Sequence, residues 1–250
     1  MVRGIDVFRK HFKGFENQYV LIGGAACDIL FAKNNSQFRA TRDLDMVLIV
    51  EALTPEFGEK FWEFVEVGQY RNKVTSGGKP QFYRFDKPEN DEYPKMLELF
   101  ARNDCSLKTM SGLTKIHIDD EVSSLSAILL NDEYYRVLLA GRGVIQELCV
   151  LRPEYLILFK AKAYLDLSER KENGENVDSR DIKKHKNDIL RILAEFVLEE
   201  VEDLPEIVTR DVETFIKGLE VAPFDDNLLK TLGLSNKDMV DRLVELYGMK

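Results

Sequence analysis

The chain has 250 residues, of which 44% are hydrophobic, so it can bury a sizeable core and is not a disordered protein. At this length it forms one large domain or two small ones. The net charge is −9, and residues 195–226, with eleven acidic and two basic side chains, carry all of that excess. Because the remainder is neutral overall, the composition argues against broad nonspecific DNA binding but is compatible with an anionic ligand in the first 194 residues.

Neither a membrane span nor a secretory leader is expected. The uncharged apolar runs are far shorter than the ~18–20 residues that cross a bilayer, and the first residues, MVRGIDVFRKHF, lack the apolar centre of a signal peptide. The cysteines Cys27, Cys105 and Cys149 are odd in number and have no CxxC spacing, which is typical of reduced thiols in a cytoplasmic protein. Three scattered histidines do not suit a histidine-built zinc site.

The first part of the chain alternates expected helices and strands. In chain order they are a helix at 5–15, a strand at 19–22, a helix at 25–33, a strand at 43–50, a helix at 55–66, strands near 70–75 and 81–86, and a strand at 95–100. Gly77-Gly78 is expected in the turn between the strands near 70–75 and 81–86. Residues 106–150 show no clear pattern.

The last part of the chain has helical periodicity throughout. Helices are expected at 153–170, 179–200, 206–219 and 235–247. The sequence therefore predicts an α+β protein, with a mixed sheet and flanking helices in residues 1–150 and a helical domain in residues 151–250.

Asp43 and Asp45 begin the clearest strand, DLDMVLIV, and their spacing of two places both carboxylates on one face. Two such acids repel each other unless a cation lies between them, and Mg²⁺ is the usual one. The alternative is that Asp43 caps the preceding loop while Asp45 is simply exposed.

Glu98 is a third acid in a strand-like context. It lies between Leu97 and Leu99 in KMLELF and points away from both. A charge within a short apolar strand needs a partner, because burying it alone is costly. Either Glu98 joins Asp43 and Asp45 as a metal ligand, or its strand is an edge strand and Glu98 faces water.

Gly23-Gly24 lies between a strand and a helix, where glycine lets a ligand approach the backbone and the helix N-terminus favours anions. This predicts a phosphate-binding turn, although an ordinary tight turn has the same pattern. Arg39 and Arg42 flank Thr41 just before the acid pair, and they can hold phosphate oxygens, pair with the acids, or be exposed loop residues.

Together these motifs resemble the nucleotidyltransferase superfamily of DNA polymerase β type: a Gly-Gly turn, an acid-x-acid strand and a third acid on a separate strand. The arginine and threonine before the acid pair are similar to those of the AbiEii-like group, the toxins of type IV toxin–antitoxin systems. In the helical half, Lys160, Ala163, Arg170 and Arg180-Asp181 follow that group's order, with Lys162 competing for the lysine position. The third acid is glutamate where the superfamily more often has aspartate. The resemblance covers residues 19–190.

The resemblance implies an enzyme that uses two Mg²⁺ ions and a nucleoside triphosphate. It implies that Asp43, Asp45 and Glu98 hold metal. It also implies further catalytic roles for Lys160 and Asp181. The residues that it implies for nucleotide contacts are Gly23, Gly24, Arg39, Thr41 and Lys162. It also implies an acceptor hydroxyl on RNA, such as a tRNA end, or on a protein, and a cognate antitoxin as partner.

The residues of the second long helix can also be explained without the resemblance. Asp181, His185 and Asp188 share one helical face, and the acids interleaved with the KKHK tract favour a solvated, ion-paired helix over a nucleic-acid surface. Lys160 can equally extend along the edge of an amphipathic helix toward water.

Three other functions remain open. The chain can be a nucleotidyltransferase that modifies a small molecule such as an antibiotic, a catalytically silent nucleotide-binding or interaction module, or a structural partner protein. In the last case the acidic segment 195–226 serves as the contact surface, and it can equally bind a basic antitoxin.

Overall fold

A computed structural model describes residues 2–74, 80–101, 105–109, 112–116, 128 and 131–249. The chain divides into two compact units. The N-terminal unit contains Met1–Leu130 and Arg142–Leu151, and the C-terminal unit contains Asn131–Gly141 and Arg152–Lys250. Within the described residues no helix is long and apolar enough to cross a membrane.

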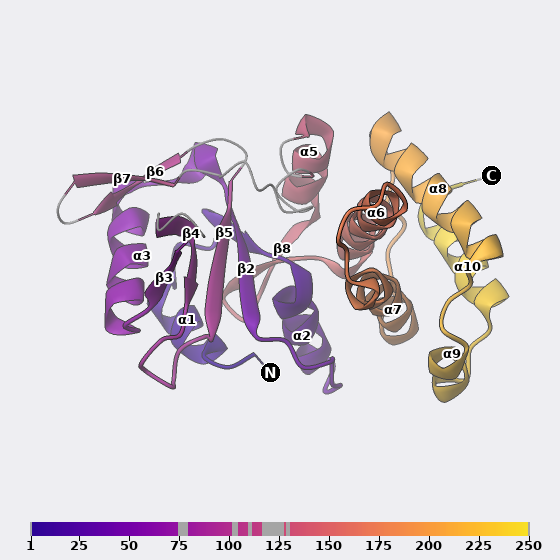
Figure 1. The fold of residues 1–250 in the computed structure, drawn as a ribbon, viewed down its shortest axis with the longest axis horizontal. Helices are drawn as coiled ribbons and strands as arrows, with labels where there is room; N and C mark the ends of the chain where they lie inside the picture. The colour runs from indigo at the N-terminus through magenta and orange to yellow at the C-terminus, as the bar shows by residue number, and fades with distance from the viewer. Residues whose placement is uncertain are drawn as a thin grey trace. The chain divides into compact units, whose positions relative to one another are not determined.

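The N-terminal unit is built on a mixed seven-stranded sheet with the order β3-β4-β5-β2-β1-β9-β8 (Figure 1). Its strands are β1 (Tyr19–Leu21), β2 (Asp43–Leu48), β3 (Arg71–Val74), β4 (Pro80–Asp86), β5 (Met96–Phe100), β8 (Arg142–Ile145) and β9 (Leu148–Leu151). Two neighbouring pairs are parallel, β2 with β5 and β1 with β9, and the others are antiparallel. A separate two-stranded sheet contains β6 (Cys105–Thr109) and β7 (Gly112–Ile116).

The α-helices of this unit whose bounds the structure describes are α1 (Ile5–His11), α2 (Gly23–Lys33) and α3 (Pro55–Val67), with a 3-10 turn η1 (Val50–Ala52) before α3. The start of α3 follows from its sequence. Thr54 caps it by accepting a 3.3 Å hydrogen bond from the amide of Phe57, and Pro55 occupies the first turn, where its missing N–H costs nothing.

An aromatic core fixes which face of the sheet is apolar. Phe8 of α1 contacts Phe64 of α3 and Tyr19 of β1, with ring centroids 5.7 Å and 5.5 Å apart. Phe61 of α3 packs on Phe85 of β4 at 5.5 Å. These five rings are almost completely buried, so α1 and α3 cover the sheet face that carries Tyr19 and Phe85.

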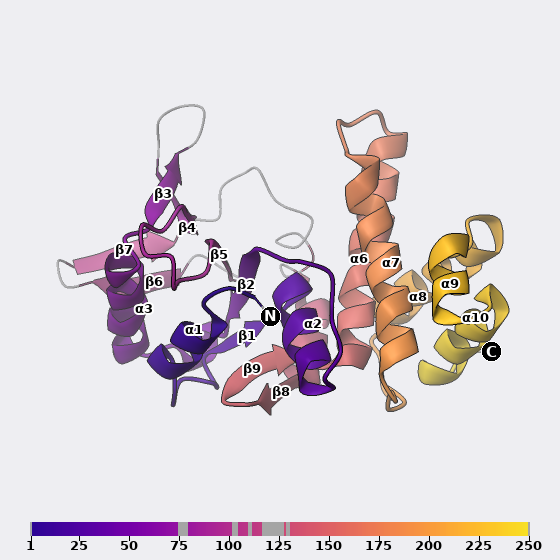
Figure 2. The same cartoon turned by 90° about the horizontal axis from the view of Figure 1, so that it is seen from below.

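The C-terminal unit is entirely helical in the described residues. Its helices are α5 (Asp132–Gly141), α6 (Pro153–Glu172), α7 (Ser179–Glu195), α8 (Glu206–Val221), α9 (Asp226–Leu232) and α10 (Asn236–Leu246). The long helices α6 and α7 lie side by side (Figure 2). Arg242 of α10 donates hydrogen bonds to the carbonyls of Leu193 and Phe196, which satisfies the end of α7.

The predicted α+β class is confirmed, and most expected elements are present within a few residues of their predicted bounds. The helix expected at 179–200 is five residues too long, because the Arg242 contacts close it at Glu195. The compact units differ from the expected limits 1–150 and 151–250 in the place of α5, which groups with the C-terminal helices because Tyr134 of α5 packs on Phe159 of α6. The sequence patterns do not predict the helices α5 and α9 or the strands β6 to β9. The turn expected at Gly77-Gly78 lies outside the described residues.

Candidate functional site

The predicted acids Asp43, Asp45 and Glu98 lie on one face of two neighbouring strands. In the parallel pairing of β2 with β5, Asp45 is directly opposite Glu98, and Asp43 is opposite Met96. Directly paired residues in adjacent strands point to the same face, and so do residues two apart. The prediction that the three carboxylates share a face is therefore confirmed by the strand register.

The two faces of these strands differ in exposure. Leu44 and Leu97 point to the other face and are at most 1% exposed, whereas Asp45 and Glu98 are only partly buried. Strand β5 lies between β4 and β2, so the alternative of an edge strand with Glu98 facing water is wrong. The acids therefore lie on internal strands of the sheet, on a face that is partly accessible to solvent.

Gly23 lies against Asp45. Its φ of 64° is in the left-handed region, and a Cβ atom at this position would collide with the Asp45 carboxylate. The backbone completes the contact, because the amide of Ile22 donates a 3.1 Å hydrogen bond to the carbonyl of Asp45. Glycine is thus required here both by conformation and by the close approach of a carboxylate.

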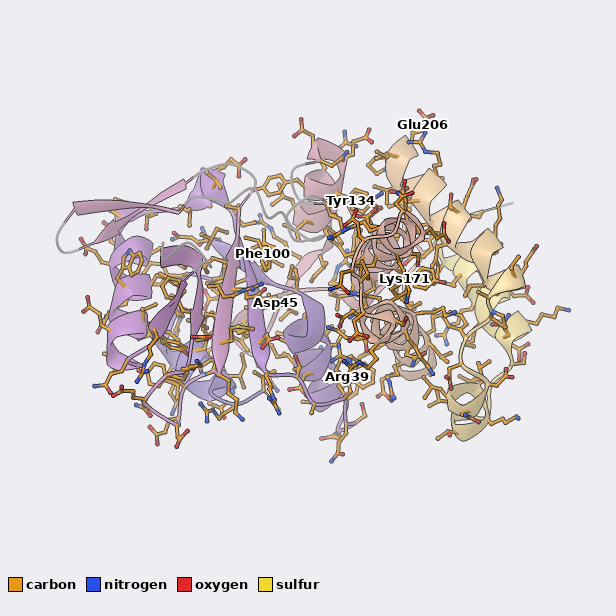
Figure 3. All side chains as sticks on the ribbon, in the orientation of Figure 1. Arg39, Asp45, Phe100, Tyr134, Lys171 and Glu206 are labelled. Carbon is orange, nitrogen blue, oxygen red and sulfur yellow. The ribbon has the colours of Figure 1, made fainter. Side chains whose placement is uncertain are left out.

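Gly24 lies against the loop that precedes β2. A Cβ atom on Gly24 would be 2.6 Å from the Thr41 hydroxyl and 3.7 Å from a terminal nitrogen of Arg39. The Arg39 guanidinium also lies 5.1 Å from the centroid of the Phe38 ring. The structure therefore brings together Gly23, Gly24, Arg39, Thr41 and Asp45, as the sequence motifs predict; Figure 3 labels Arg39 and Asp45.

The start of α2 provides backbone donors at the same place. Ile22 occupies the N-cap position and has no side-chain oxygen with which to cap the first amides of the helix. An uncapped N-terminal turn with two glycines favours an anion, because its N–H groups and the helix dipole both present positive charge.

Glu98 is engaged by a basic residue that the sequence motifs do not identify. Arg84 of β4 is the antiparallel partner of Glu98, and its Nε lies 2.5 Å from Oε1 of that carboxylate. The two side chains are 26% and 12% exposed. In QFYRFD, Arg84 and Phe85 point to opposite faces of the strand, and Phe85 is buried on the apolar face. This pattern identifies Arg84 as a partner of Glu98 only when β4 is known to adjoin β5.

The acids match magnesium in chemistry but do not form a closed cage. Carboxylate oxygens are the ligands that Mg²⁺ prefers, usually one or two of them together with water and phosphate oxygens. Among the residues that the structure describes, no group of three acidic, histidine or cysteine side chains is arranged to hold an ion. Since Glu98 pairs with Arg84, its carboxylate has a cationic partner already.

The predicted lysine and acid of the helical half have different surroundings. Lys160 of α6 is 4% exposed, and its Nζ lies 2.7 Å from Oδ2 of Asp188 on α7. The idea that Lys160 extends toward water is therefore wrong. Asp181 is exposed, and the buried acid of that helical face is Asp188. Asp188 shares the predicted stripe with Asp181, but the spacing alone does not reveal which of the two faces α6.

Lys162 points to a different neighbour from Lys160. Its ammonium lies 3.1 Å from Asp166 and 3.3 Å from Asp211 of α8, and Asp211 accepts a 2.9 Å hydrogen bond from the Tyr134 hydroxyl. Burial acts to lower the pKa of Lys162, but the two carboxylates outweigh it and raise that pKa. Burial raises the pKa of Asp166 in spite of Lys162.

The acidic segment 195–226 is partly internal. Asp211 contacts Lys162 as described, and Asp225 forms a 2.6 Å ion pair with Lys183. The segment is thus not simply a free acidic surface. It also contains Val197 and Val221, which are 100% and 90% exposed.

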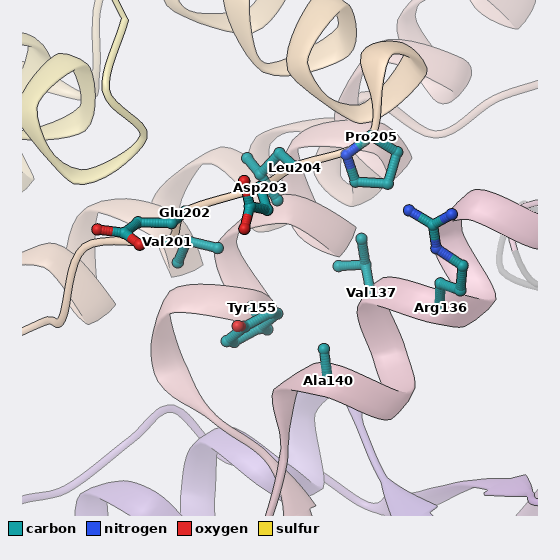
Figure 4. Close-up of a pocket in the computed structure, with 9 residues that line it drawn as sticks. All are labelled: Arg136, Val137, Ala140, Tyr155, Val201, Glu202, Asp203, Leu204 and Pro205. Carbon is teal, nitrogen blue, oxygen red and sulfur yellow. The ribbon is translucent and has the colours of Figure 1, made fainter.

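A hollow of about 110 Å³ lies within the C-terminal unit. Figure 4 shows Tyr155 on one wall, Arg136 at one end and Glu202 and Asp203 on the connection before α8. Its other lining residues are Val137, Ala140, Val201, Leu204 and Pro205. None of the predicted site residues lines it.

Comparison with known proteins adds no assignment. No protein-family model matches the chain, and no curated protein or solved structure matches it either.

Proposed function

We propose that the N-terminal unit is a magnesium-dependent nucleotidyltransferase, which transfers a nucleoside monophosphate from a nucleoside triphosphate to an acceptor hydroxyl. The observation that carries the proposal is the register of β2 and β5, which sets Asp43, Asp45 and Glu98 on one face. The contact of Gly23 with the Asp45 carboxylate adds a phosphate-binding turn directly beside that face. An acid cluster and a phosphate-binding turn at one place suit a metal-bound triphosphate.

In this proposal Asp43, Asp45 and Glu98 hold the metal. Bound Mg²⁺ would neutralise phosphate charge and orient the triphosphate. The amides at Gly23 and Gly24 donate to phosphate oxygens, and the Arg39 guanidinium adds a charge-assisted contact. The glycine turn, Arg39 and Asp45 would be positioned by the folded chain before the nucleotide arrives, and such positioning is the main source of rate in phosphoryl transfer.

The chemical step is an in-line displacement at the α-phosphorus. The acceptor oxygen forms a bond to phosphorus while the bond to the bridging oxygen breaks, and pyrophosphate leaves with the electron pair. The acceptor proton passes to a carboxylate of the cluster, for which Glu98 is the proposed base. Thr41 contacts Gly24 and keeps the arginine-bearing loop against the phosphate-binding turn.

The acceptor is proposed from the family resemblance alone. It favours an RNA end, such as that of tRNA, or a protein hydroxyl, and a biological role as a toxin held in check by an antitoxin. The parts assigned to Lys160, Lys162 and Asp181 in the reaction rest on the same resemblance. A small-molecule acceptor is compatible with the same acid cluster.

The test is transfer of label from an α-³²P nucleoside triphosphate in the presence of Mg²⁺. Asp45→Asn should lower incorporation by roughly a hundredfold or more, because a metal ligand supplies several kcal/mol of the transition-state stabilisation. Asp91→Asn is the matched control, since Asp91 is 95% exposed in a surface pair with Arg3. Parallel reactions with tRNA, with total protein and with aminoglycosides identify the acceptor class.

Full activity of the Asp45→Asn protein would remove the acid cluster from the reaction. Tight binding of Mg²⁺ and nucleotide by calorimetry, with no turnover on any acceptor, would instead favour a catalytically silent nucleotide-binding module. The Arg84–Glu98 ion pair supports this second function, because it gives one of the three acids a cationic partner other than a metal.

A further inference from the structure

Three charged side chains form a row across neighbouring strands of the sheet. Asp45 of β2 is paired with Glu98 of β5, and Glu98 is paired with Arg84 of β4. Directly paired residues share a face, so the guanidinium lies on the same side as the carboxylates. Figure 1 shows β4, β5 and β2 as adjacent strands.

The direction of Arg84 is set by packing on the opposite face. Its neighbour Phe85 is fully buried, lies opposite Leu97 and packs against Phe61 of α3 at 5.5 Å between ring centroids. Because successive residues of a strand point to opposite faces, this anchor turns Arg84 toward the acids. The Nε–Oε1 distance of 2.5 Å then makes Glu98 its direct partner.

We propose that Arg84 is a positioning residue that competes with the divalent cation for Glu98. The inference rests on the proposed function, because it takes Glu98 as a metal ligand. A carboxylate oxygen that binds a guanidinium has less electron density for a metal, and a guanidinium next to a divalent ion is repelled by it. Binding of the ion therefore requires Glu98 to leave Arg84.

When the ion replaces Arg84 as the partner of Glu98, the arginine becomes free on the face where the triphosphate is expected. A free guanidinium has several donors in a planar fork and suits phosphate oxygens. Arg84 would thus hold Glu98 until metal and nucleotide arrive together, and the protein would bind the ion weakly in the absence of nucleotide.

The experiment measures Mn²⁺ binding by the nucleotide-free, full-length protein with electron paramagnetic resonance. Arg84→Met keeps the aliphatic bulk of the side chain and removes its charge. It should bind Mn²⁺ roughly tenfold to thirtyfold more tightly than the wild type, the size expected from one unit charge about 4–6 Å from a divalent ion at the dielectric constant of water. Arg84→Lys restores a charge and should return the affinity toward the wild-type value.

Two further variants isolate the effect. Arg71→Met is the matched control, since Arg71 belongs to the same sheet but forms a 3.1 Å ion pair with Glu89, and its Mn²⁺ affinity should equal that of the wild type. The Arg84→Met gain should become smaller when Glu98→Gln is already present, because the part of it that comes from competition acts through that carboxylate. Thermal melting confirms that each variant is folded.

The outcomes separate this inference from the proposed function. If Arg84→Met binds Mn²⁺ no more tightly than the wild type while Asp45→Asn abolishes binding, the competition is refuted and the metal site stands. If Arg84→Met binds more tightly but the wild type transfers no nucleotide, the competition stands and the enzymatic proposal fails. If no variant binds Mn²⁺, both are overturned.

Discussion

Removal of the Lys160 ammonium tests whether the buried ion pair between α6 and α7 is a major source of stability in the C-terminal unit. The side chains of Lys160 and Asp188 are 5% and 0% exposed, and Nζ and Oδ2 are 2.7 Å apart. At an effective dielectric constant of ~20, two charges at this separation attract by about 6 kcal/mol, of which desolvation offsets a part. We therefore expect Lys160→Met to lower the free energy of unfolding by roughly 3–5 kcal/mol.

The assay is urea unfolding followed by circular dichroism, combined with hydrogen exchange of the α6 and α7 amides. Exchange is needed because two units need not unfold in one transition. The double variant Lys160→Met/Asp188→Leu should recover most of the loss, because neither charge of this pair then remains buried. Lys217→Met, at a lysine that is 74% exposed and pairs with Glu213 at 3.4 Å, is the control and should stay within about 0.5 kcal/mol of the wild type.

A loss below about 1 kcal/mol for Lys160→Met would refute this reasoning, since a buried pair would then be worth no more than a surface one. So would a double variant that is no more stable than the single one. Either result would mean that water or other polar groups reach Asp188 when the ammonium is removed.

Three further predictions concern a glycine, a thiol and a helix cap. Gly23→Ala should destabilise the protein more than Gly14→Ala in urea unfolding. Both glycines have positive φ, 64° and 89°, but a Cβ at Gly23 would strike a carboxylate while none of the described atoms lies within 4 Å at Gly14; equal midpoints would contradict this. Burial raises the pKa of Cys149 to about 11, so iodoacetamide at pH 8 should leave it unmodified in the native protein and label it in urea, as read by peptide mass spectrometry; equal labelling in both states would contradict this. Hydrogen bonds from the side chain and amide of Arg180 lower the pKa of Asp178 from 3.8 to about 2, so the stability it contributes is present above pH 4 and is lost as the pH falls toward 2. The gap in urea midpoint between the wild type and Asp178→Asn should therefore shrink between pH 6 and pH 3, and a constant gap would argue against the cap.

The composition of the acid face could be predicted because side-chain alternation is a local property of a strand. DLDMVLIV and KMLELF each show which residues share a face, and the register of β2 with β5 joins the two patterns. That β4 lies on the other side of β5 is a tertiary fact. The role of Arg84 as the partner of Glu98 could not be inferred without it.

The helical half shows the same limit. The period of α7 places Asp181 and Asp188 on one stripe, but only the packing of α6 against α7 selects the buried acid. Likewise β9 has no alternating pattern, since all four of its residues are buried, and a short apolar run of this kind is compatible with helix or strand. It becomes a strand because β1 offers a parallel partner at Leu21.

The chain passes between the two units three times, because α5 interrupts the N-terminal unit before β8 and β9 complete its sheet. A truncation at the apparent boundary near residue 150 would leave α5 attached to the N-terminal fragment. The buried rings of Tyr134 and Tyr135 would then be exposed to water. During synthesis the central sheet cannot be completed until residue 151 has left the ribosome, because β9 pairs with β1, which lies far away in the sequence. The two units are therefore interdependent products of one polypeptide, and separate expression of either half should yield aggregation-prone material.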